Sequence, residues 1–357
     1  VRLGNSGLKI SRIILGCMSY GSQDWQGWVL PEEEAIKHIK FAYEHGITTF
    51  DTADMYSNGL SEIILGKAIK QLDLPRGEIV IMTKLCAPIY KDQTINQMLP
   101  SEEFGVINQR GLNRKHIFDG VKAALERLQT DHIDLLQCHR FDRSTPIEET
   151  MQALHDVVKA GWVRYIGMSS CYAYEFHAMQ NYAITNKLTP FISMQNHYSL
   201  LYREEEREMM PTLKMFGVGA VPWSPLARGL LARPFDEKTA RATEDAFMGL
   251  VDGISFGAEI VGRVEALAKK KGISMAHVAM AWIMSRPGVA APIVGTTKLS
   301  NLEDILGSLD VELTEEETKY LEEPYRPLPV LGHRTNVVAD AFLVSLCSLN
   351  RNSDKTR

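Results

Sequence analysis

Residues 47–62 read ITTFDTADMYSNGLSE, and they contain one copy of the unit from which the fold is built. Residues 47–50 are apolar or β-branched, as in a short buried strand, and the strand ends at the carboxylate of Asp51. Tyr56 lies on the turn that follows, and a helical pattern begins at Ser61. A strand, a turn and a helix in this order are typical of a parallel β/α protein.

The same unit recurs along the chain. Nearly continuous apolar runs, typical of parallel strands buried on both faces, occupy residues 13–18, 47–50, 79–83, 133–138, 163–168, 191–194, 218–222 and 290–294. Helical patterns lie between or after them, at 32–45, 61–72, 113–128, 146–160, 204–215, 275–285 and 300–309. Eight such strands predict a (β/α)8 TIM barrel.

The 357 residues favour one domain, because barrels of this size are routinely single domains and no linker-like stretch interrupts the pattern. We predict that the barrel covers residues 1–333. Two long intervals, 86–111 and 226–257, follow strands and are expected to be extended loops on the C-terminal face, where barrel active sites are built. Residues 334–357 break the pattern and are expected to form a peripheral or loosely ordered tail.

Composition excludes several classes of protein. The net charge is −5 and no basic block is present, so neither nucleic acid nor an anionic membrane is an expected partner. The five cysteines are scattered without a Cys-x-x-Cys pair, which argues against a disulfide framework or a zinc ribbon and favours a reducing, cytoplasmic location. No apolar run reaches the length of a membrane span, and the N-terminus lacks the apolar core of a signal peptide.

Polar side chains stand at or just beyond the strand ends, where a barrel would bring them together. They are Ser19, Asp51, Lys84, His139, Ser169, Ser170, Gln195, Asn196, Trp223, Ser224, Thr296, Thr297 and Lys298. Taken singly, each has an ordinary structural explanation, such as a turn former or a solvated strand end. Asp51 and Lys84, on adjacent strands, are different, because a buried carboxylate and a buried ammonium each need the other to offset desolvation.

That pair suggests acid–base chemistry at Tyr56. A free tyrosine has a pKa near ~10 and is a poor proton donor at neutral pH. We expect the Lys84 ammonium to stabilise the phenolate and lower the pKa, Asp51 to keep Lys84 charged, and His139 to orient a substrate oxygen. A nucleophile elbow, a Walker loop and metal-ligand spacing are absent from the sequence. A Gly-x-Gly-x-x-Gly after a strand is also absent, so a dinucleotide would not bind in the Rossmann manner.

These residues and their surroundings resemble the aldo-keto reductase superfamily from about residue 3 to residue 332. The matching stretches, in order, are LGCMSYG (15–21), FDTADMYSNGLSE (50–62), TK (83–84), IDLLQCHR (133–140), IGMSS (166–170), MQNHYSLLYREEE (194–206), PWSPLARGLL (222–231) and PIVGTTKLSNLEDIL (292–306). Within the superfamily, the long-loop branch with aryl-alcohol-dehydrogenase-like reductases is the most similar.

The resemblance implies an NADPH-dependent carbonyl reductase that also runs in reverse as an alcohol dehydrogenase. Tyr56 would be the general acid, Lys84 and Asp51 its tuning pair, and His139 the residue that orients the carbonyl. Ser169 and Gln195 would hold the nicotinamide carboxamide, Trp223 would stack on the ring, and Lys298 would meet the 2′-phosphate. The full set implied for NADP(H) is Gly16, Met18, Asp51, Ser169, Ser170, Gln195, Trp223, Ser224, Leu226, Gly229, Gly295, Thr297, Lys298 and Asn301.

At two positions the sequence differs from the family pattern, which weakens two of the residue roles that the resemblance implies. Ser170 stands where the family often has asparagine, and so allows at most a shorter contact with the carboxamide. Asp304-Ile305 replaces the glutamate–asparagine pair that contacts adenine, which puts an adenine contact there in doubt.

The substrate is the least determined part of the prediction. Aromatic residues in the extended loops and after the fifth strand suggest a pocket for an aromatic or apolar aldehyde or ketone, or else simply pack the loops onto the barrel. The candidates are Trp25, Trp28, Tyr90, Phe104 and Tyr172.

The sequence also allows two alternatives to an active reductase. One is a non-catalytic NADP(H)-binding regulatory subunit, similar to the potassium-channel β-subunits of the same superfamily. The other is a metal-dependent hydrolase on a (β/α)8 barrel, which the lack of His/Asp ligand spacing disfavours. We expect no metal site, and the sequence leaves the oligomeric state undetermined.

Overall fold

The computed structural model describes residues 1–95, 105–237 and 256–333. Within them, eight parallel strands form one sheet in the order β7-β6-β5-β4-β3-β2-β1-β8. The strands are β1 Ile14–Gly16, β2 Thr49–Asp51, β3 Val80–Leu85, β4 Ile133–Cys138, β5 Val163–Ser169, β6 Phe191–Gln195, β7 Gly219–Ala220 and β8 Ile293–Val294. The predicted (β/α)8 barrel is confirmed. The prediction for the tail, 334–357, and the candidate Phe104 lie outside the described residues.

The barrel closes between its two shortest strands. Parallel bridges join Ala220 to Val289 and Trp223 to Ile293, and so connect the β7 edge of the sheet to the β8 edge. The amide of Ile293 donates to the carbonyl of Pro222 at 2.8 Å. On its other side, β8 pairs with β1 through Ile14 and Ile293. Every strand therefore has two neighbours, and the strand ends converge on one rim.

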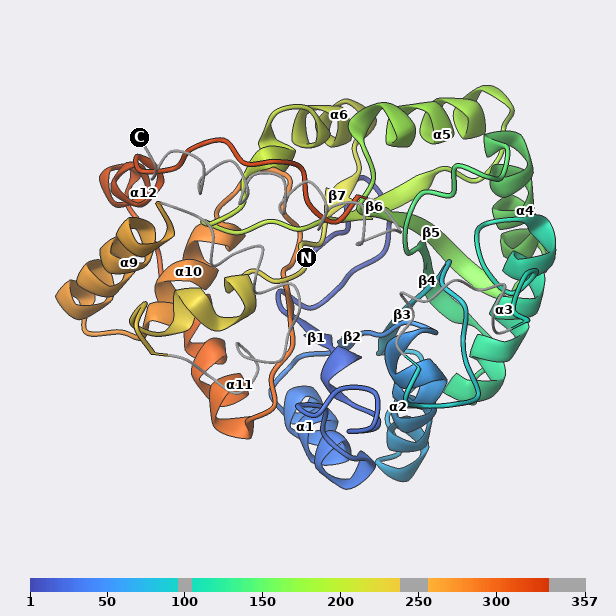
Figure 1. The fold of residues 1–357 in the computed structure, drawn as a ribbon, viewed down its shortest axis with the longest axis horizontal. Helices are drawn as coiled ribbons and strands as arrows, with labels where there is room; N and C mark the ends of the chain where they lie inside the picture. The colour runs from blue at the N-terminus through green and yellow to red at the C-terminus, as the bar shows by residue number, and fades with distance from the viewer. Residues whose placement is uncertain (96–104, 238–255, 334–357) are drawn as a thin grey trace, which may run out of the picture.

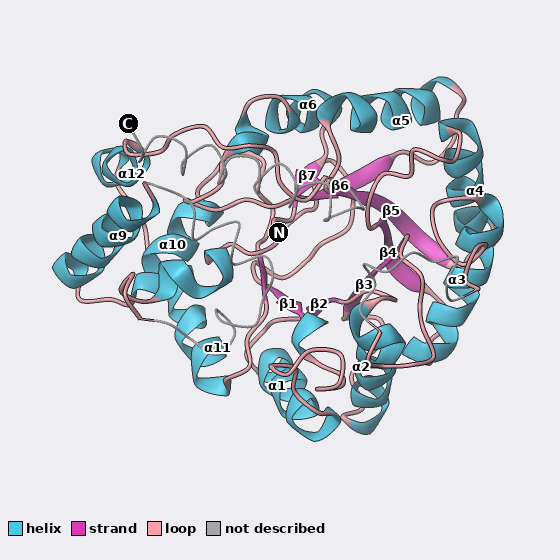
Figure 2. Ribbon diagram, in the orientation of Figure 1, coloured by secondary structure: helices cyan, strands magenta, loops and turns pink. Residues whose placement is uncertain are grey.

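Helices surround the strands, as Figures 1 and 2 show, with α1 and α2 below the sheet in this view and α5 and α6 above it. They are α1 Glu32–Glu44, α2 Leu60–Gln71, α3 Arg114–Leu128, α4 Ile147–Lys159, α5 Ala173–Thr185, α6 Met209–Phe216, α9 Gly257–Lys271, α10 Met275–Met284, α11 Leu299–Leu306 and α12 Glu315–Glu322. Short 3-10 helices are η1 Cys17–Ser19, η2 Tyr56–Gly59, η4 Glu204–Glu206, η5 Ala227–Ala232 and η6 Gly307–Asp310.

One predicted helix is wrong in its bounds. The pattern over 204–215 suggests a continuous helix, but the chain forms η4 and then restarts as α6. The carboxylate of Glu204 accepts hydrogen bonds from the Leu328 amide and the Tyr325 hydroxyl, both far along the chain. These tertiary contacts hold the first turn in place and override the local helical preference. The helices α5, α9 and α12 are absent from the predicted set.

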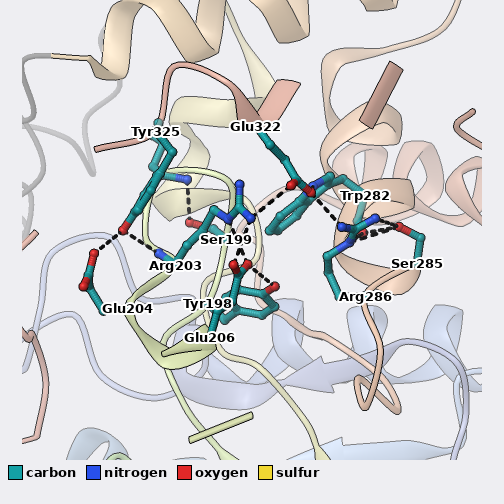
Figure 3. Close-up of polar contacts among 11 residues, drawn as sticks. Tyr198, Ser199, Arg203, Glu204, Glu206, Trp282, Ser285, Arg286, Glu322 and Tyr325 are labelled. Atoms are coloured by element: carbon teal, nitrogen blue, oxygen red, sulfur yellow. Dashed lines mark hydrogen bonds and ion pairs between the residues drawn. The ribbon is translucent and has the colours of Figure 1, made fainter. Parts of the chain in front are cut away.

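Figure 3 shows the contacts that attach α12, the last helix of the described residues, to the barrel. Arg203, at the start of η4, bonds both carboxylate oxygens of Glu206 and reaches Glu322 of α12 at 3.0 Å. Glu322 also accepts from the indole of Trp282 and from Arg286, at the end of α10. The charges in this cluster, which lines a surface cavity of about 350 Å³, are paired with one another. The geometry of this cluster indicates a structural role, in which it holds α12 against the barrel.

The barrel interior has two layers. Side chains at alternate strand positions share one face, so β3 contributes Met82 to one layer and Lys84 to the next. The lower layer is apolar and includes Ile14, Val80, Met82, Leu135, Val221 and Ile293, closed below by Leu3 and Ile10 of the N-terminal segment. One step further along the strands come Asp51, Lys84, Gln137, Ser193 and Gln195, all buried. The catalytic candidates thus sit on a packed apolar floor.

Gly167 of β5 makes room for this polar layer. A Cβ at Gly167 would overlap the Ser193 hydroxyl, while the next nearest atoms, Ser193 O and Gln137 Cγ, would lie at 3.2 and 3.3 Å. The Ser193 hydroxyl has no hydrogen-bond partner among the described residues. The clash therefore depends mainly on one oxygen atom.

We expect Gly167→Ala to lower the free energy of unfolding by roughly 1–3 kcal/mol, because overpacking a close-packed interior forces neighbouring atoms to move. Ser193→Ala alone should cost little, and the double variant Gly167→Ala/Ser193→Ala should recover most of the loss. Urea denaturation of the four proteins measures this. Equal instability of the single Gly167→Ala and the double variant would show that Ser193 is not the obstacle.

Candidate active site

Four predicted catalytic residues meet at the rim formed by β2, β3 and β4. Asp51 is the last residue of β2, Lys84 lies in β3, Tyr56 begins η2, and His139 follows β4. All four are buried, with Lys84 only 1% exposed. Neighbouring strands place them because Asp51 pairs with Met82 and Leu85 pairs with Cys138. Parallel strands of matched register therefore deliver these side chains to one place.

The Lys84 ammonium is the centre of the site. Its Nζ donates to Asp51 Oδ2 at 2.6 Å, to the Thr52 carbonyl at 2.8 Å and to the Tyr56 hydroxyl at 3.2 Å. An ammonium has three N–H donors and no acceptor, so all three donors are used. The charge of Asp51 and the bonds to Asp51 and Tyr56 oppose the effect of burial, and the pKa of Lys84 is raised. Lys84 is therefore charged at neutral pH.

This geometry fixes the direction of the Tyr56 proton. Because Lys84 can only donate, the Tyr56 oxygen accepts this bond, and its own hydrogen points away from the lysine. The sequence led us to expect a lowered pKa, but burial outweighs the lowering effect of the Lys84 charge, and the pKa of Tyr56 is raised. Tyr56 is thus protonated at neutral pH, with a cation in place to stabilise the phenolate once the proton leaves.

His139 faces Tyr56 from the end of β4. The two rings meet edge to face, with centroids 5.8 Å apart and an interplanar angle of 83°. Burial and the positive charges of Arg140 and Lys84 hold the pKa of His139 well below its usual range, so the ring is neutral at neutral pH. Its Nδ1 has no hydrogen-bond partner among the described residues. A neutral imidazole next to the phenol can position a polar oxygen.

Two glutamines hold the second oxygen of Asp51. Gln195 Nε2 donates to Asp51 Oδ1 at 2.8 Å and to Gln137 Oε1 at 3.1 Å, and Gln137 Nε2 donates to the same Asp51 oxygen at 3.2 Å. Asp51 is therefore bonded on both oxygens, which fixes its orientation toward Lys84. Sequence reasoning missed Gln137, because a lone glutamine inside an apolar strand carries no signal. Its position opposite Lys84 in the β3–β4 register could have identified it.

The rim beyond β5, β6 and β7 holds the residues expected at the nicotinamide. Ser169 donates its hydroxyl to the Gln195 carbonyl at 2.7 Å, which leaves its oxygen as an acceptor. Ser170 is fully buried and accepts a hydrogen bond from the Trp223 indole at 3.0 Å. In this structure Ser170 thus positions Trp223. The serine that replaces the family's usual asparagine therefore makes a hydrogen bond inside the protein.

Trp223 belongs to a stack of three rings. His197 lies parallel to Trp223, with centroids 4.3 Å apart, and parallel to Tyr202 on its other side, at 4.5 Å. Burial lowers the pKa of His197 to about 3, so this ring is also neutral at neutral pH. The stack and the Ser170 bond together define the position of the indole.

The segment after Trp223 has an unusual backbone. Ser224, Ala227 and Arg228 all adopt positive φ angles, of 53°, 47° and 57°, and Gly229 follows at 99°. For residues other than glycine this conformation costs on the order of 1 kcal/mol each and is concentrated at functional sites. Turns in which a right-handed residue precedes a left-handed one also point successive amide groups in one direction, as in anion-binding loops. This geometry fits the expected role of Ser224, Leu226 and Gly229 at a pyrophosphate.

Lys298 stands at the N-cap of α11. Its side chain is exposed and makes no ion pair within the described residues. Thr296 Oγ1 accepts from the Lys298 amide and from Asn301 Nδ2, so Thr296 joins these two predicted cofactor residues in one small turn. A free cation at a helix N-terminus suits a phosphate group. Gly295 and Gly16 lie beside each other at the β8–β1 junction, where an added Cβ at Gly295 would meet the Gly16 carbonyl at 3.4 Å.

The Asp304-Ile305 departure has a structural explanation. Asp304 accepts a hydrogen bond from Ser274 at 2.8 Å and lies 3.2 Å from His277, both on the α10 side. Ile305 is buried in the main hydrophobic core. The contacts of both side chains are therefore within the protein, and none of them points either side chain toward the rim.

The candidate substrate residues separate into two groups. Trp25 and Trp28 form one buried apolar cluster with Val29, Ala53 and Tyr56, and Met18 packs against it. This places both tryptophans beside the phenol. Tyr90 is buried, and its amide donates to Asn58, two residues beyond Tyr56. Tyr172 instead packs against His333 and Tyr174, and the structure shows no contact between it and Tyr56.

At the C-terminal rim of this (β/α)8 barrel, where barrel active sites are built, Lys84 is bonded to both Asp51 and Tyr56. A model of the Aldo/keto reductase family matches residues 12–326. The chain belongs to this family, as its resemblance indicated, and is an oxidoreductase of carbonyl and alcohol groups. Family membership sets aside the metal-dependent hydrolase. Within the described residues, no group of three or more His, Cys, Asp or Glu side chains is arranged to hold a metal ion.

Several fungal proteins are similar over nearly their whole length. Versiconal hemiacetal acetate reductase of Aspergillus parasiticus is 51% identical over 334 residues, which cover 91% of this chain and 96% of that protein. A Schizosaccharomyces pombe protein provisionally named aryl-alcohol dehydrogenase is 49% identical, with 92% and 96% covered. An aldo-keto reductase of Fusarium vanettenii is 45% identical, with 93% and 92% covered. The predicted similarity to aryl-alcohol-dehydrogenase-like reductases is confirmed. None of the helices in the described ranges is both long enough and apolar enough to cross a membrane.

The neutral, buried His197 should make the fold sensitive to acid. Its folded pKa, about 3, lies below the ordinary value of 6.5, so between these values the unfolded chain binds a proton that the folded chain does not. Stability is therefore lost as the pH falls below about 6.5. From pH 7 to pH 5 the contribution of this one group is about 2 kcal/mol.

We expect His197→Phe, which keeps a ring between Tyr202 and Trp223 but cannot titrate, to lose about 2 kcal/mol less than the wild type over that range. Urea denaturation at pH 7, 6 and 5 measures the difference. His177→Phe, on the exposed side of α5, is the matched control and should follow the wild type. The same pH slope in His197→Phe and in the wild type would contradict the assignment.

Proposed function

We propose that the protein is an NADPH-dependent carbonyl reductase of the cytoplasm, which reduces an aldehyde or ketone and in reverse oxidises an alcohol. The observation that carries this proposal is the triply bonded Lys84, with Asp51 and Tyr56 among its three acceptors. The four cysteines within the described residues are buried and free, in keeping with a reducing compartment.

Tyr56 acts as the general acid. Its hydrogen points away from Lys84, toward the rim, where a carbonyl oxygen bound beside His139 accepts it. As the proton moves, the Lys84 ammonium stabilises the phenolate at 3.2 Å, and Asp51 holds the lysine in place. General acid catalysis of this kind contributes roughly 10²–10⁴-fold. In alcohol oxidation the phenolate takes the proton back.

The residues present fit NADP(H), which supplies the hydride to the carbonyl carbon when bound. Ser169 and the Oε1 of Gln195 offer acceptors to a carboxamide, and Trp223 is held by Ser170 for stacking. The segment 224–229, with positive φ angles at Ser224, Ala227, Arg228 and Gly229, suits a pyrophosphate, and Lys298 suits a 2′-phosphate. Gln195 also donates to Asp51, so one amide touches both the cofactor position and the catalytic pair.

An aromatic or apolar carbonyl compound is the best candidate substrate. Trp25 and Trp28 belong to the same buried apolar cluster as Tyr56. Apolar side chains with a few directed polar groups are typical of small-molecule pockets. The rival reading, a regulatory subunit that binds NADP(H) without turnover, gains no support from any contact in this site.

We expect Tyr56→Phe to reduce NADPH oxidation with a test aldehyde by at least 10²-fold, because the phenol proton is lost while the ring remains. NADPH binding, followed by fluorescence titration, should be nearly unchanged. Tyr182→Phe, a partly buried position on α5, is the control for the substitution itself. Full activity in Tyr56→Phe would assign the acid to another residue, and no turnover by the wild type over a broad carbonyl panel would favour the regulatory reading.

We expect Lys298→Ala to weaken NADPH binding at least tenfold and to affect NADH little, because only NADPH carries the 2′-phosphate. Dissociation constants for both cofactors, measured at one salt concentration, test this. Lys159→Ala, exposed at the end of α4, is the matched control. Equal losses for the two cofactors would remove Lys298 from the phosphate site.

A further inference from the structure

Arg140 is a cation at the candidate active-site rim that forms no ion pair with a carboxylate of the described residues. It follows His139 directly after β4, and its side chain is partly buried. Its one hydrogen bond in the structure runs from Nη1 to the His139 carbonyl at 2.5 Å. Two other arginines near this rim are paired: Arg143 with Glu175 at 2.5 Å and Arg203 with Glu206 at 2.8 Å. Within the described residues, Arg140 has no such carboxylate.

The surroundings of Arg140 place its charge inside the site. Burial lowers the pKa of Arg140, and the groups whose charge acts on it are Tyr56, Cys86 and Cys171, a phenol and two thiols. The positive charge of Arg140 in turn opposes the burial that raises the pKa of Tyr56, and adds to the burial that lowers the pKa of His139 and His197. These residues come from the ends of β2 to β6, so the guanidinium acts on groups around this half of the rim.

An unpaired, desolvated guanidinium is costly unless another group completes its contacts. A guanidinium has five N–H donors in a planar fork that matches a carboxylate, and the bond to His139 uses one of them. Tyr56 already has its cation in Lys84, at 3.2 Å. The remaining donors of Arg140 are therefore available to a ligand bound at this rim.

We propose that Arg140 binds a carboxylate on the substrate, so that the preferred substrates are aromatic or apolar carbonyl compounds that carry an acidic group close to the reacting carbonyl. This inference rests on the proposed reductase activity and names its substrate class. The two recognition elements come from different sectors of the rim. Trp25 and Trp28, after β1, supply the apolar wall, and Arg140, after β4, supplies the cation.

The test compares each of 2-, 3- and 4-carboxybenzaldehyde with its methyl ester, which keeps the aldehyde and removes the charge. Steady-state kinetics with NADPH give kcat/KM for the wild type, Arg140→Met and Arg140→Lys. For at least one isomer, we expect the wild type to prefer the acid to the ester by tenfold or more. Arg140→Met should lower this ratio at least tenfold, mainly through KM, and Arg140→Lys should retain part of it.

An unchanged acid-to-ester ratio in Arg140→Met would overturn the proposal. So would an equal fall in kcat for acid and ester, which would mean that the charge acts on Tyr56 rather than on the substrate. If Arg140→Met does not fold, as judged by circular dichroism, Arg140→Gln replaces it in the comparison.

Failure of the proposed activity is distinguished by a binding measurement. Calorimetry measures binding of carboxybenzyl alcohols and their methyl esters to the wild-type protein and to Arg140→Met, without any turnover. Selective binding of the acid that requires Arg140, with no reduction of any aldehyde, would uphold this inference and overturn the reductase. Reduction of aldehydes with no preference for the acid in either measurement would uphold the reductase and overturn this inference.

Discussion

The buried contact between Lys84 and Asp51 constrains the rest of this structure. A charged pair taken out of water is tolerated only when the remaining donors and acceptors are also bonded. Here the Thr52 carbonyl and the Tyr56 hydroxyl accept the other two hydrogen bonds of Lys84. Gln137 and Gln195 donate to the second oxygen of Asp51. These partners come from β2, η2, β3, β4 and β6, so the site forms only when these parts of the barrel are in register. The same bonds that stabilise the pair also position Tyr56.

The polar layer also explains why the barrel is built from side chains of unequal size. Asp51, Lys84 and the two glutamines need space above an apolar floor, and Gly167 supplies it by having no side chain. Asp51, Lys84, Tyr56 and His139 are all buried. In such surroundings the pKa of Tyr56 is raised and that of His139 is lowered, so both are uncharged before a ligand binds. Electrostatic contacts are stronger here than in water, which favours proton transfer over a short distance.

Much of this could be predicted from the sequence, because a barrel brings strand ends together whatever their separation along the chain. Asp51, Tyr56, Lys84 and His139 were found in this way, and the β/α pattern gave the fold. The remainder depends on tertiary contacts that leave no local trace. Burial outweighed the charge of Lys84 at Tyr56, Ser170 turned to the Trp223 indole, and Glu204 interrupted a helix by bonding to residues more than a hundred positions away. Gln137 became recognisable only once the strand register was known.

The closure of the barrel has a consequence for the chain during its synthesis. β1 pairs with β8, and the register joins Ile14 to Ile293, so one edge of the first strand has no partner until nearly the whole chain has left the ribosome. At about 5–20 residues per second this interval lasts tens of seconds. An open strand edge is a template for pairing with other chains. Because β1 spans only three residues, Ile14–Gly16, it offers other nascent chains a very small surface for aggregation during this time.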